Sequence, residues 1–308
     1  MTTPPPPAPL VKELRDKTGA GMMDCKAALT ETNSDMEAAI DWLRKKGLSK
    51  AAKKAGRVAA EGLIGIAAQG NIGALVEVNA ETDFVARNDE FKAFVKDAAA
   101  HALAAEGDVE KLLARAHNGA TVDARLKELI AKIGENMSVR RAVVLAVDPG
   151  IVATYVHNAA GPELGKIGVL VALKSTADKE KLAALGRQLA MHVAAAAPIA
   201  LTAAHVPAET LAREKAIHAD TARQSGKPEN VIEKMIEGRM RKYFEEVVLL
   251  QQTFVIDGET KIEKLLEKAS KDLGAPVAIE GFVRFQVGEG IEKADSDFAD
   301  EVSKMAGH

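Results

Sequence analysis

An internal repeat constrains the fold of this chain more than any other feature. The stretch IGALVEVN at 72–79 resembles IGVLVALK at 167–174, and an alanine-rich helical segment follows each. Another strand-like segment precedes each copy, LIGIAAQ or VATYVHN, and a further helix and strand follow. Such a succession packs as a hairpin, two helices and a third strand. We therefore predict an α+β protein whose core is duplicated, with antiparallel sheets.

The two copies differ in length at two places. His101 follows Asn79 by 22 positions, whereas His192 follows Lys174 by 18, so the first copy has about four extra residues between strand and helix. They fall within ETDFVARND. The second copy carries a larger insertion of two helical segments separated by GKP, which predicts an antiparallel helical hairpin. Its second helix has an apolar residue at every fourth position, namely Ile232, Ile236, Met240 and Phe244.

These patterns divide the chain into successive parts. We expect a Pro-rich tail at 1–9, a three-helix N-terminal module at 10–50, a basic linker at 51–62, a first α+β half at 63–148, a second half at 149–196 and 247–290, the inserted hairpin at 197–246, and a C-terminal module at 291–308 with a short amphipathic helix. Ser34 or Asp35 is expected to cap the third helix of the N-terminal module, and Gly47 is expected to end it.

Composition excludes several classes of function. A net charge of -3 argues against bulk nucleic-acid binding, and a single cysteine, Cys25, allows neither an intrachain disulfide nor a cysteine-based zinc site. No apolar run is long enough to span a bilayer, and the first residues lack the features of a signal peptide, so we expect a cytoplasmic protein. No phosphate-binding loop, dinucleotide turn or paired metal-ligand spacing is present. We therefore expect no cofactor, no metal and no catalytic residues, with His101 and His192 in packing roles.

The basic run at 44–57 contains no acidic residue. It is interpreted either as a solvated linker or as a contact with an acidic surface, protein or RNA. No aromatic side chains for stacking on bases are interleaved with it, so direct nucleic-acid binding is not expected.

The stretch TDFVARND places a phenylalanine beside an aspartate in a connection between a strand and a helix. In one interpretation Asp83 caps the following helix and Phe84 packs back onto the core. In the other, Phe84 is an exposed wedge that enters a pocket on a partner, with the charge of Asp83 beside it. The shorter connection in the second copy favours the wedge, because that copy folds without these residues.

Several dispersed stretches, in the same order, resemble bacterial elongation factor Ts proteins. They are LRDKTGAGMMDCKAAL, AETDFVARNDEF, MHVAA, QSGKPENVIEKMIEGRMRKYFEEVVLL and GFVRFQVGEGIEKADSDFADEV. The resemblance covers essentially the whole chain after the Pro-rich tail. It implies a ubiquitin-associated-like N-terminal module, a two-part α+β core, a dimerisation-type helical hairpin and a C-terminal module.

The resemblance also implies a function. Members of this family are guanine-nucleotide exchange factors for elongation factor Tu, the GTPase that delivers aminoacyl-tRNA. By resemblance, Thr82, Asp83, Phe84 and Val85 would disturb the partner's Mg²⁺ and phosphate site, and His157 would make a further contact with the partner. Self-association would use the hairpin, and no membrane is involved. The alternative is a protein-binding adaptor or chaperone without exchange activity.

Overall fold

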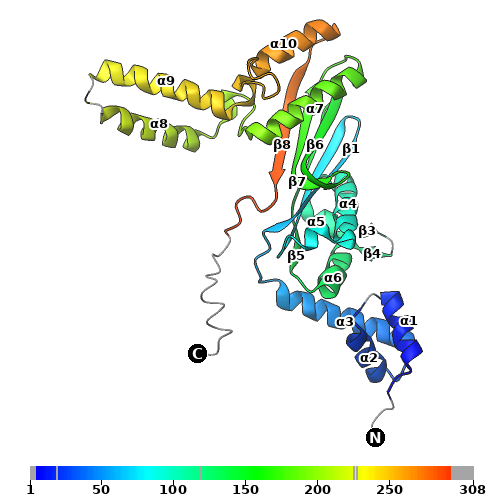
Figure 1. The fold of residues 1–308 in the computed structure, drawn as a ribbon. Coiled ribbons are helices and arrows are strands. Elements are labelled where there is room, and N and C mark those ends of the chain that lie inside the picture. Colours follow the sequence, from blue (N-terminus) through cyan, green and yellow to red (C-terminus); the bar gives the residue numbers. More distant parts are fainter. Residues whose placement is uncertain (1–4, 19, 118, 225, 227, 293–308) are drawn as a thin grey trace.

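A computed structural model describes residues 5–292 apart from 19, 118, 225 and 227. The chain forms an elongated α+β molecule in which a cluster of helices, a long curled sheet and a projecting pair of helices follow one another (Figure 1). Most of the predicted C-terminal module and the first residues of the Pro-rich tail lie outside the described residues.

The N-terminal module consists of α1 (Ala8–Thr18), α2 (Met22–Glu31) and α3 (Met36–Lys54). Its small core is formed by Val11, Leu14, Cys25, Ala28, Leu29 and Ala39. Burial raises the pKa of the Cys25 thiol, because the thiolate would lose its hydration there. As predicted, Asp35 caps α3, since its side chain accepts a hydrogen bond from the amide of Ala38.

The predicted end of the third helix at Gly47 is wrong, because α3 continues to Lys54. A Cβ at Gly47 would lie 3.2 Å from the Cβ of Ala131 in α6 (Val122–Ile133). The glycine therefore lets α3 approach α6 closely. Packing between distant segments overrides the weak tendency of glycine to end a helix.

The sheet consists of two three-stranded halves. The first half has the order β5–β2–β1 and the second the order β8–β7–β6, so the repeated strands occupy equivalent places. The strands are β1 (Glu61–Gln69), β2 (Ile72–Ala80), β5 (Met137–Ala146), β6 (Gly150–Gly161), β7 (Leu164–Lys174) and β8 (Ala278–Gln286). All their pairings are antiparallel. The strands predicted from the repeat are confirmed.

The antiparallel sheets predicted for the duplicated core are joined in the structure into one continuous six-stranded sheet. Strands β1 and β7 pair through Ile64 with Gly165 and Gly65 with Leu164. Beside this seam, a Cβ at Gly168 would lie 2.5 Å from Cγ2 of Ile64. Only glycine allows the strands to come this close, so the repeat fuses into one sheet at a narrow seam.

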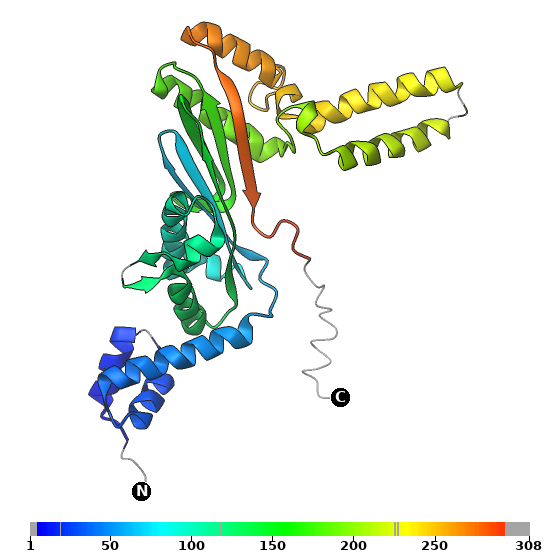
Figure 2. The ribbon, with the colours of Figure 1, turned by 180° about the vertical axis from the view of Figure 1, so that it is seen from behind.

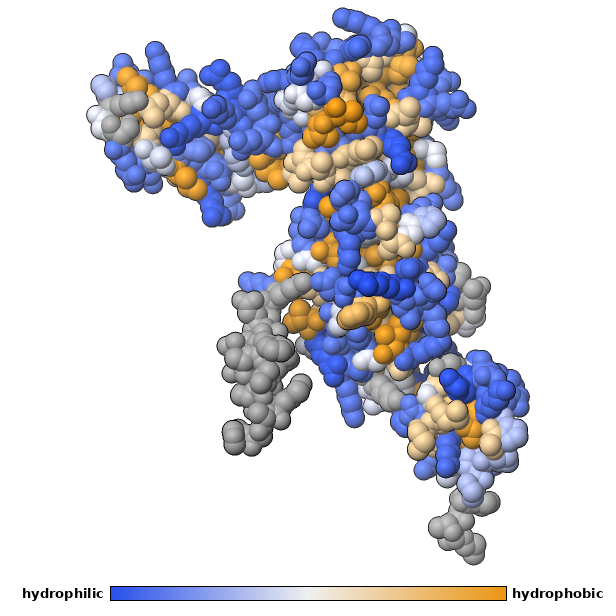
Figure 3. All heavy atoms as spheres, in the orientation of Figure 1, coloured by the Kyte–Doolittle hydropathy of each residue, from blue (hydrophilic) through white to orange (hydrophobic). Residues whose placement is uncertain are grey.

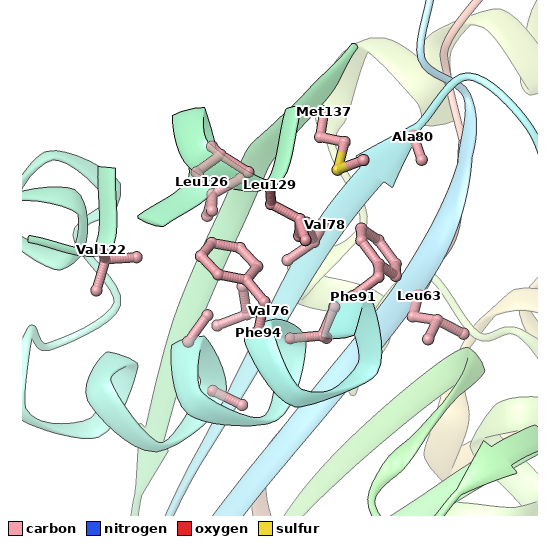
Figure 4. Packing of buried hydrophobic residues seen from close by; sticks show 14 of the residues in the cluster. Leu63, Val76, Val78, Ala80, Phe91, Phe94, Val122, Leu126, Leu129 and Met137 are labelled. Carbon is pink, nitrogen blue, oxygen red and sulfur yellow. The ribbon is translucent and has the colours of Figure 1, made fainter. Parts of the chain in front are cut away.

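Helices pack against both halves of the sheet (Figure 2). The first half carries α4 (Asp89–Ala104), α5 (Val109–Ala114) and α6, with the small strands β3 (Ala116–His117) and β4 (Ala120–Thr121) beside them. Phe91 and Phe94 of α4 point toward Val76 and Val78 of β2, and Leu126 and Leu129 of α6 complete this core (Figure 4). The second half carries α7 (Lys179–Ala196) and α10 (Ile262–Leu273).

Two further helices, α8 (Ala208–Arg223) and α9 (Glu229–Val247), lie side by side and project away from the sheet (Figures 1 and 2). Short 3-10 turns, η2 (Ala203–His205) and η3 (Leu249–Gln251), flank them. The chain enters and leaves this pair at one point, where Ala200 and Val248 form an isolated bridge. In the space-filling view, hydrophilic residues cover much of the pair, whereas apolar residues gather over the region of α7 and α10 (Figure 3).

A buried histidine fastens this entry point to the second half of the core. The amide of Val255 donates to Nδ1 of His192, so Nε2 carries the proton and donates to Oε1 of Gln252 at 2.9 Å. Nε2 of Gln252 in turn donates to the carbonyl oxygens of Ala196 and Glu246. Burial lowers the pKa of His192, with the hydrogen bond to Gln252 acting in the opposite direction. The expected packing role of His192 agrees with this placement.

One buried carboxylate joins the first half of the core to the chain that leaves β8. Glu77 accepts hydrogen bonds from Arg140, Arg141, Asn79 and the amide of Gly288. Burial alone would raise the pKa of Glu77, but these donors together hold that pKa below its usual value. A charge without access to water is tolerated in a fold only with this degree of pairing.

Candidate partner-binding site

The connection between β2 and α4, residues 81–88, is the predicted site. Its counterpart between β7 and α7 comprises residues 175–178, so the extra residues inferred from the repeat do lie in this connection. It contains a turn of 3-10 helix, η1 (Val85–Arg87). The first-half core shown in Figure 4 lies directly beneath it, because Phe91 in the first turn of α4 is fully buried.

Phe84 points into solvent, with 73% of its surface exposed. Burying a side chain of this size stabilises a protein by about 1.5–3 kcal/mol, and the free chain lacks this contribution from Phe84. The interpretation in which Phe84 packs onto the core is therefore wrong. Single exposed apolar side chains are common on protein surfaces, so the exposure of Phe84 by itself does not define a function.

Asp83 is half-buried and does not cap α4, contrary to the capping interpretation. The cap is Asn88, whose Oδ1 accepts hydrogen bonds from the amides of Glu90 and Phe91. Asp83 instead pairs with Arg87, with 3.1 Å between Oδ2 and the guanidinium nitrogen. The same guanidinium lies 5.9 Å from the centre of the Phe84 ring. Arg87 thus contacts both side chains of the predicted wedge, and cation–π geometry favours this position.

Thr82 and Val85, on either side of these two residues, face inward. The amide and the hydroxyl of Thr82 donate to the two oxygens of Glu135, at 2.9 and 2.7 Å. Val85 is only 3% exposed and belongs to the first-half core. This placement differs from the outward contact expected of Val85. The predicted set therefore consists of two outward residues held between two inward ones.

His157 lies on β6 in the second half of the sheet, where it is exposed and opposite Ile167 of β7. Its Nδ1 is 3.3 Å from the hydroxyl of Tyr155. No hydrogen bond, ion pair or ring contact within the described chain joins it to residues 82–85. The turn after β6 does reach the first half, since the carbonyl oxygen of Glu163 accepts from the amide of Ile66 and its carboxylate lies 3.6 Å from Lys96 of α4.

The sequence interpretation missed the residues that hold the loop. Glu135 and Asn136 lie between α6 and β5, more than 50 positions from the residues they bind. No local periodicity signals such a contact. Arg87 could have been found, because it follows Asp83 by four positions, the spacing at which opposite charges meet along a helical turn.

The described residues contain no cluster of three or more histidine, cysteine, aspartate or glutamate side chains placed to hold a metal ion. Among them, too, no helix combines the length and the apolar character needed to cross a membrane. What the site offers is an outward phenylalanine and a carboxylate on a braced turn. The site is thus an exposed surface feature of an ordered turn, and among the described residues it carries no arrangement of groups for chemistry.

Comparison with known proteins identifies the family. The model for the family "Elongation factor TS" matches residues 81–289, beginning at the first residue of the candidate loop. The elongation factor Ts of Rhodospirillum rubrum is 64% identical over 299 residues, which cover 96% of this chain and 97% of the relative. Those of Rhodospirillum centenum and Maricaulis maris are 63% and 59% identical over 302 and 305 residues, covering 97% of this chain and 98% of each relative. The chain belongs to the elongation factor Ts family, as the resemblance predicted.

Proposed function

We propose that this chain is a guanine-nucleotide exchange factor that binds elongation factor Tu with GDP and promotes release of GDP and entry of GTP. Family membership supplies the partner. The chain performs no chemistry of its own in this proposal, and its wedge disturbs the site where the partner holds Mg²⁺ and the phosphates of the nucleotide. The observation that carries the proposal is the exposure of Phe84 on a turn whose neighbouring residues are fixed.

The energies involved are compatible with a wedge. Nanomolar nucleotide binding corresponds to about 12 kcal/mol, but accelerating release about 10⁴-fold requires lowering the barrier by only about 5.5 kcal/mol. Mg²⁺ bridges the nucleotide phosphates and is held by few protein groups, so a small displacement of those groups weakens both. Insertion of Phe84, worth about 1.5–3 kcal/mol, together with the rest of an interface, supplies energy of this order.

The exchange factor and GDP each weaken the binding of the other to elongation factor Tu. If the bound factor weakens the affinity of the partner for GDP by a certain ratio, GDP weakens the affinity for the factor by the same ratio. Binding of GTP then releases the factor, which acts again. The exchange factor therefore needs no nucleotide site, and none of Thr82, Asp83, Phe84 and Val85 needs to touch the nucleotide.

Other parts of the molecule are assigned supporting roles in this proposal. The N-terminal module, interpreted as ubiquitin-associated-like, docks onto the partner; Met22 and Met23, at the start of α2 after Gly21, are exposed there. His157 makes a second contact from the other half of the sheet. The α8–α9 pair serves self-association, and the chain acts in the cytoplasm, where translation takes place.

The alternative is an adaptor or chaperone that binds a client protein without affecting nucleotide. A release assay with a fluorescent GDP analogue bound to elongation factor Tu separates the two. Adding a catalytic amount of this chain, well below the concentration of elongation factor Tu, should accelerate release by several orders of magnitude. Complex formation without any acceleration would favour the adaptor.

A further inference from the structure

Phe84 has few neighbours of its own, so the direction in which it points depends on the residues before and after it. Downstream, Val85 and Ala86 are buried and fix the turn in the first-half core. Upstream, the fixed point is Thr82, whose amide and hydroxyl both donate to the carboxylate of Glu135. Hydrogen bonds to a charged acceptor are about twice as strong as those between neutral groups.

Glu135 is itself held in place by the turn to which it belongs. Gly134, which precedes it, adopts a left-handed conformation (φ = 90°) and ends α6, and its carbonyl oxygen accepts from Lys54 of α3. Asn136, which follows it, donates its amide hydrogen to Glu81. The side-chain amide of Asn136 donates to the carbonyl oxygen of Arg57 at 2.7 Å.

This turn therefore joins two otherwise separate parts of the chain. On one side are Lys54 and Arg57, at and just after the end of the N-terminal module. On the other are Glu81 and Thr82, at the start of the candidate loop, and Arg57 also lies 3.5 Å from Glu81. Because α3 packs closely on α6, the turn has a rigid base, and Glu135 does not have to be ordered when it binds Thr82.

We propose that Glu135 is a positioning residue for nucleotide exchange, which holds the wedge in its active geometry through Thr82. The inference rests on the proposed exchange function. Thr82 acts in it as the loop's anchor and not as a donor to the partner, since its amide and its hydroxyl hydrogen are both already committed to Glu135. Without the anchor the loop must be ordered during each exchange event, which lowers the rate at which the bound complex loses GDP.

The first test is the maximal rate of GDP release at saturating exchange factor, measured together with the concentration that gives half of this rate. Glu135→Ala should lower the maximal rate about tenfold, because two hydrogen bonds are lost, and change the half-saturating concentration less than twofold. Thr82→Val keeps the amide but not the hydroxyl and should lower the rate about threefold. Thr82→Ser keeps both donors and should retain the rate of the unmodified chain.

The matched control is Glu90→Gln. Glu90 is a carboxylate of the same neighbourhood. It binds Lys132 at the end of α6 at 2.5 Å, and its carboxylate forms no hydrogen bond or ion pair with the described residues 81–84. Its substitution should leave the maximal rate unchanged. In the double variant Glu135→Ala/Thr82→Val the rate should fall as much as in Glu135→Ala alone, because the hydroxyl of Thr82 has no acceptor left to lose once Glu135 is absent.

Hydrogen–deuterium exchange of the free protein tests the anchor separately from activity. In Glu135→Ala, the amide of Thr82 should exchange at least tenfold faster, while amides of β2 and α4 keep their rates. The inference is wrong if Glu135→Ala retains the full maximal rate, if Glu90→Gln lowers it equally, or if only the half-saturating concentration changes. If the unmodified chain fails to accelerate GDP release, the proposed function fails instead, and the amide exchange of Thr82 still decides whether Glu135 anchors the loop.

Discussion

The two strand-to-helix connections of the duplicated core solve the same local problem in different ways. Residues 175–178 pass from β7 to α7, and Asp178 caps the helix by accepting from the amides of Glu180 and Lys181. Residues 81–88 pass from β2 to α4, and Asn88 caps in the same manner. The cap is the part that the fold requires, and both connections end on it.

The longer connection has four residues more than the shorter one uses to reach its helix. The shorter connection reaches its helix without a turn of 3-10 helix, an exposed aromatic residue or an anchoring carboxylate from a distant segment. The longer one has all three, although exposure of Phe84 contributes nothing to the stability of the free protein. The extra residues therefore include an outward side chain that the packing of the free protein does not use, which agrees with the proposed contact with another molecule. Exchanging or altering the connections tests this difference.

The largest effect is expected from replacing residues 81–88 with Ser-Thr-Ala-Asp, the sequence of residues 175–178. Acceleration of GDP release should fall at least 100-fold, because the wedge is removed. The free energy of unfolding should fall by about 2–4 kcal/mol, since Val85 and Ala86 leave the core. Denaturant unfolding and nucleotide release measure the two effects.

The reciprocal replacement, residues 81–88 placed between β7 and α7, should not raise the exchange rate of the unmodified chain. A chain with two short connections that still accelerates GDP release would contradict the proposed role of the longer one.

The next effect in size is that of Phe84→Ala. Loss of about 1.5–3 kcal/mol of burial at the interface corresponds to exchange about 10- to 100-fold slower. The melting temperature should stay within about 1 °C of that of the unmodified chain, because Phe84 is exposed. Thr176→Ala is the control, since Thr176 is exposed in the shorter connection and should affect neither quantity. A core role for Phe84 would appear as a lower melting temperature with the same activity per folded molecule.

The buried histidine of α7, the helix after the shorter connection, makes the stability of the protein depend on pH. His192 of α7 has a lowered pKa in the folded protein, so the unfolded chain binds its proton more readily. Above the ordinary histidine pKa of 6.5, His192 is neutral in both the folded and the unfolded chain, and the folded state keeps its full stability. As the pH falls through and below 6.5, the unfolded chain takes up the proton first, and this stability is lost. The free energy of unfolding should therefore decrease between pH 7.5 and 5.5, with a slope that a single proton limits to about 1.4 kcal/mol per pH unit.

His192→Leu provides the control for this measurement. It should be less stable at pH 7.5, because Gln252 and the amide of Val255 lose their partner, but its stability should vary less over the same interval. Equal slopes for the two proteins would show that protonation of His192 does not cause the decrease.

The smallest effect is expected from Arg87→Ala. The ion pair with Asp83 and the contact with the Phe84 ring are both exposed, and each is worth at most about 1 kcal/mol. Exchange should slow two- to fourfold without a change in melting temperature. Arg87→Lys keeps the charge but loses the planar contact with the ring, so its exchange rate should lie between that of the unmodified chain and that of Arg87→Ala. An effect larger than that of Phe84→Ala would mean that Arg87 itself is the main contact with the partner.

The sequence predicted those parts of this molecule that depend on residues close together along the chain. The similarity of the two copies located the repeated strands, and comparing the spacing of the two copies located the longer connection. The pattern failed where a contact between distant segments decides the outcome. Gly47 continues a helix where Ala131 packs against it, and Val85 turns inward and packs in the first-half core.

The candidate site was predictable to a similar extent. Resemblance to a family located its four consecutive residues, but not which of them face outward. Thr82 faces inward toward Glu135, a residue 53 positions away, at the junction of α6 with β5, and β5 pairs with β2. A reading of one segment at a time contains no information about such a partner.

The buried thiol of Cys25 has a consequence for labelling chemistry. It is the only cysteine in the chain, it is fully enclosed in the core of the N-terminal module, and its raised pKa keeps it protonated at neutral pH. Maleimides and iodoacetamides react with accessible thiolates, so the native chain should be almost inert to them. A cysteine placed at an exposed position such as Val58 would then carry a single fluorophore, without first removing the natural one.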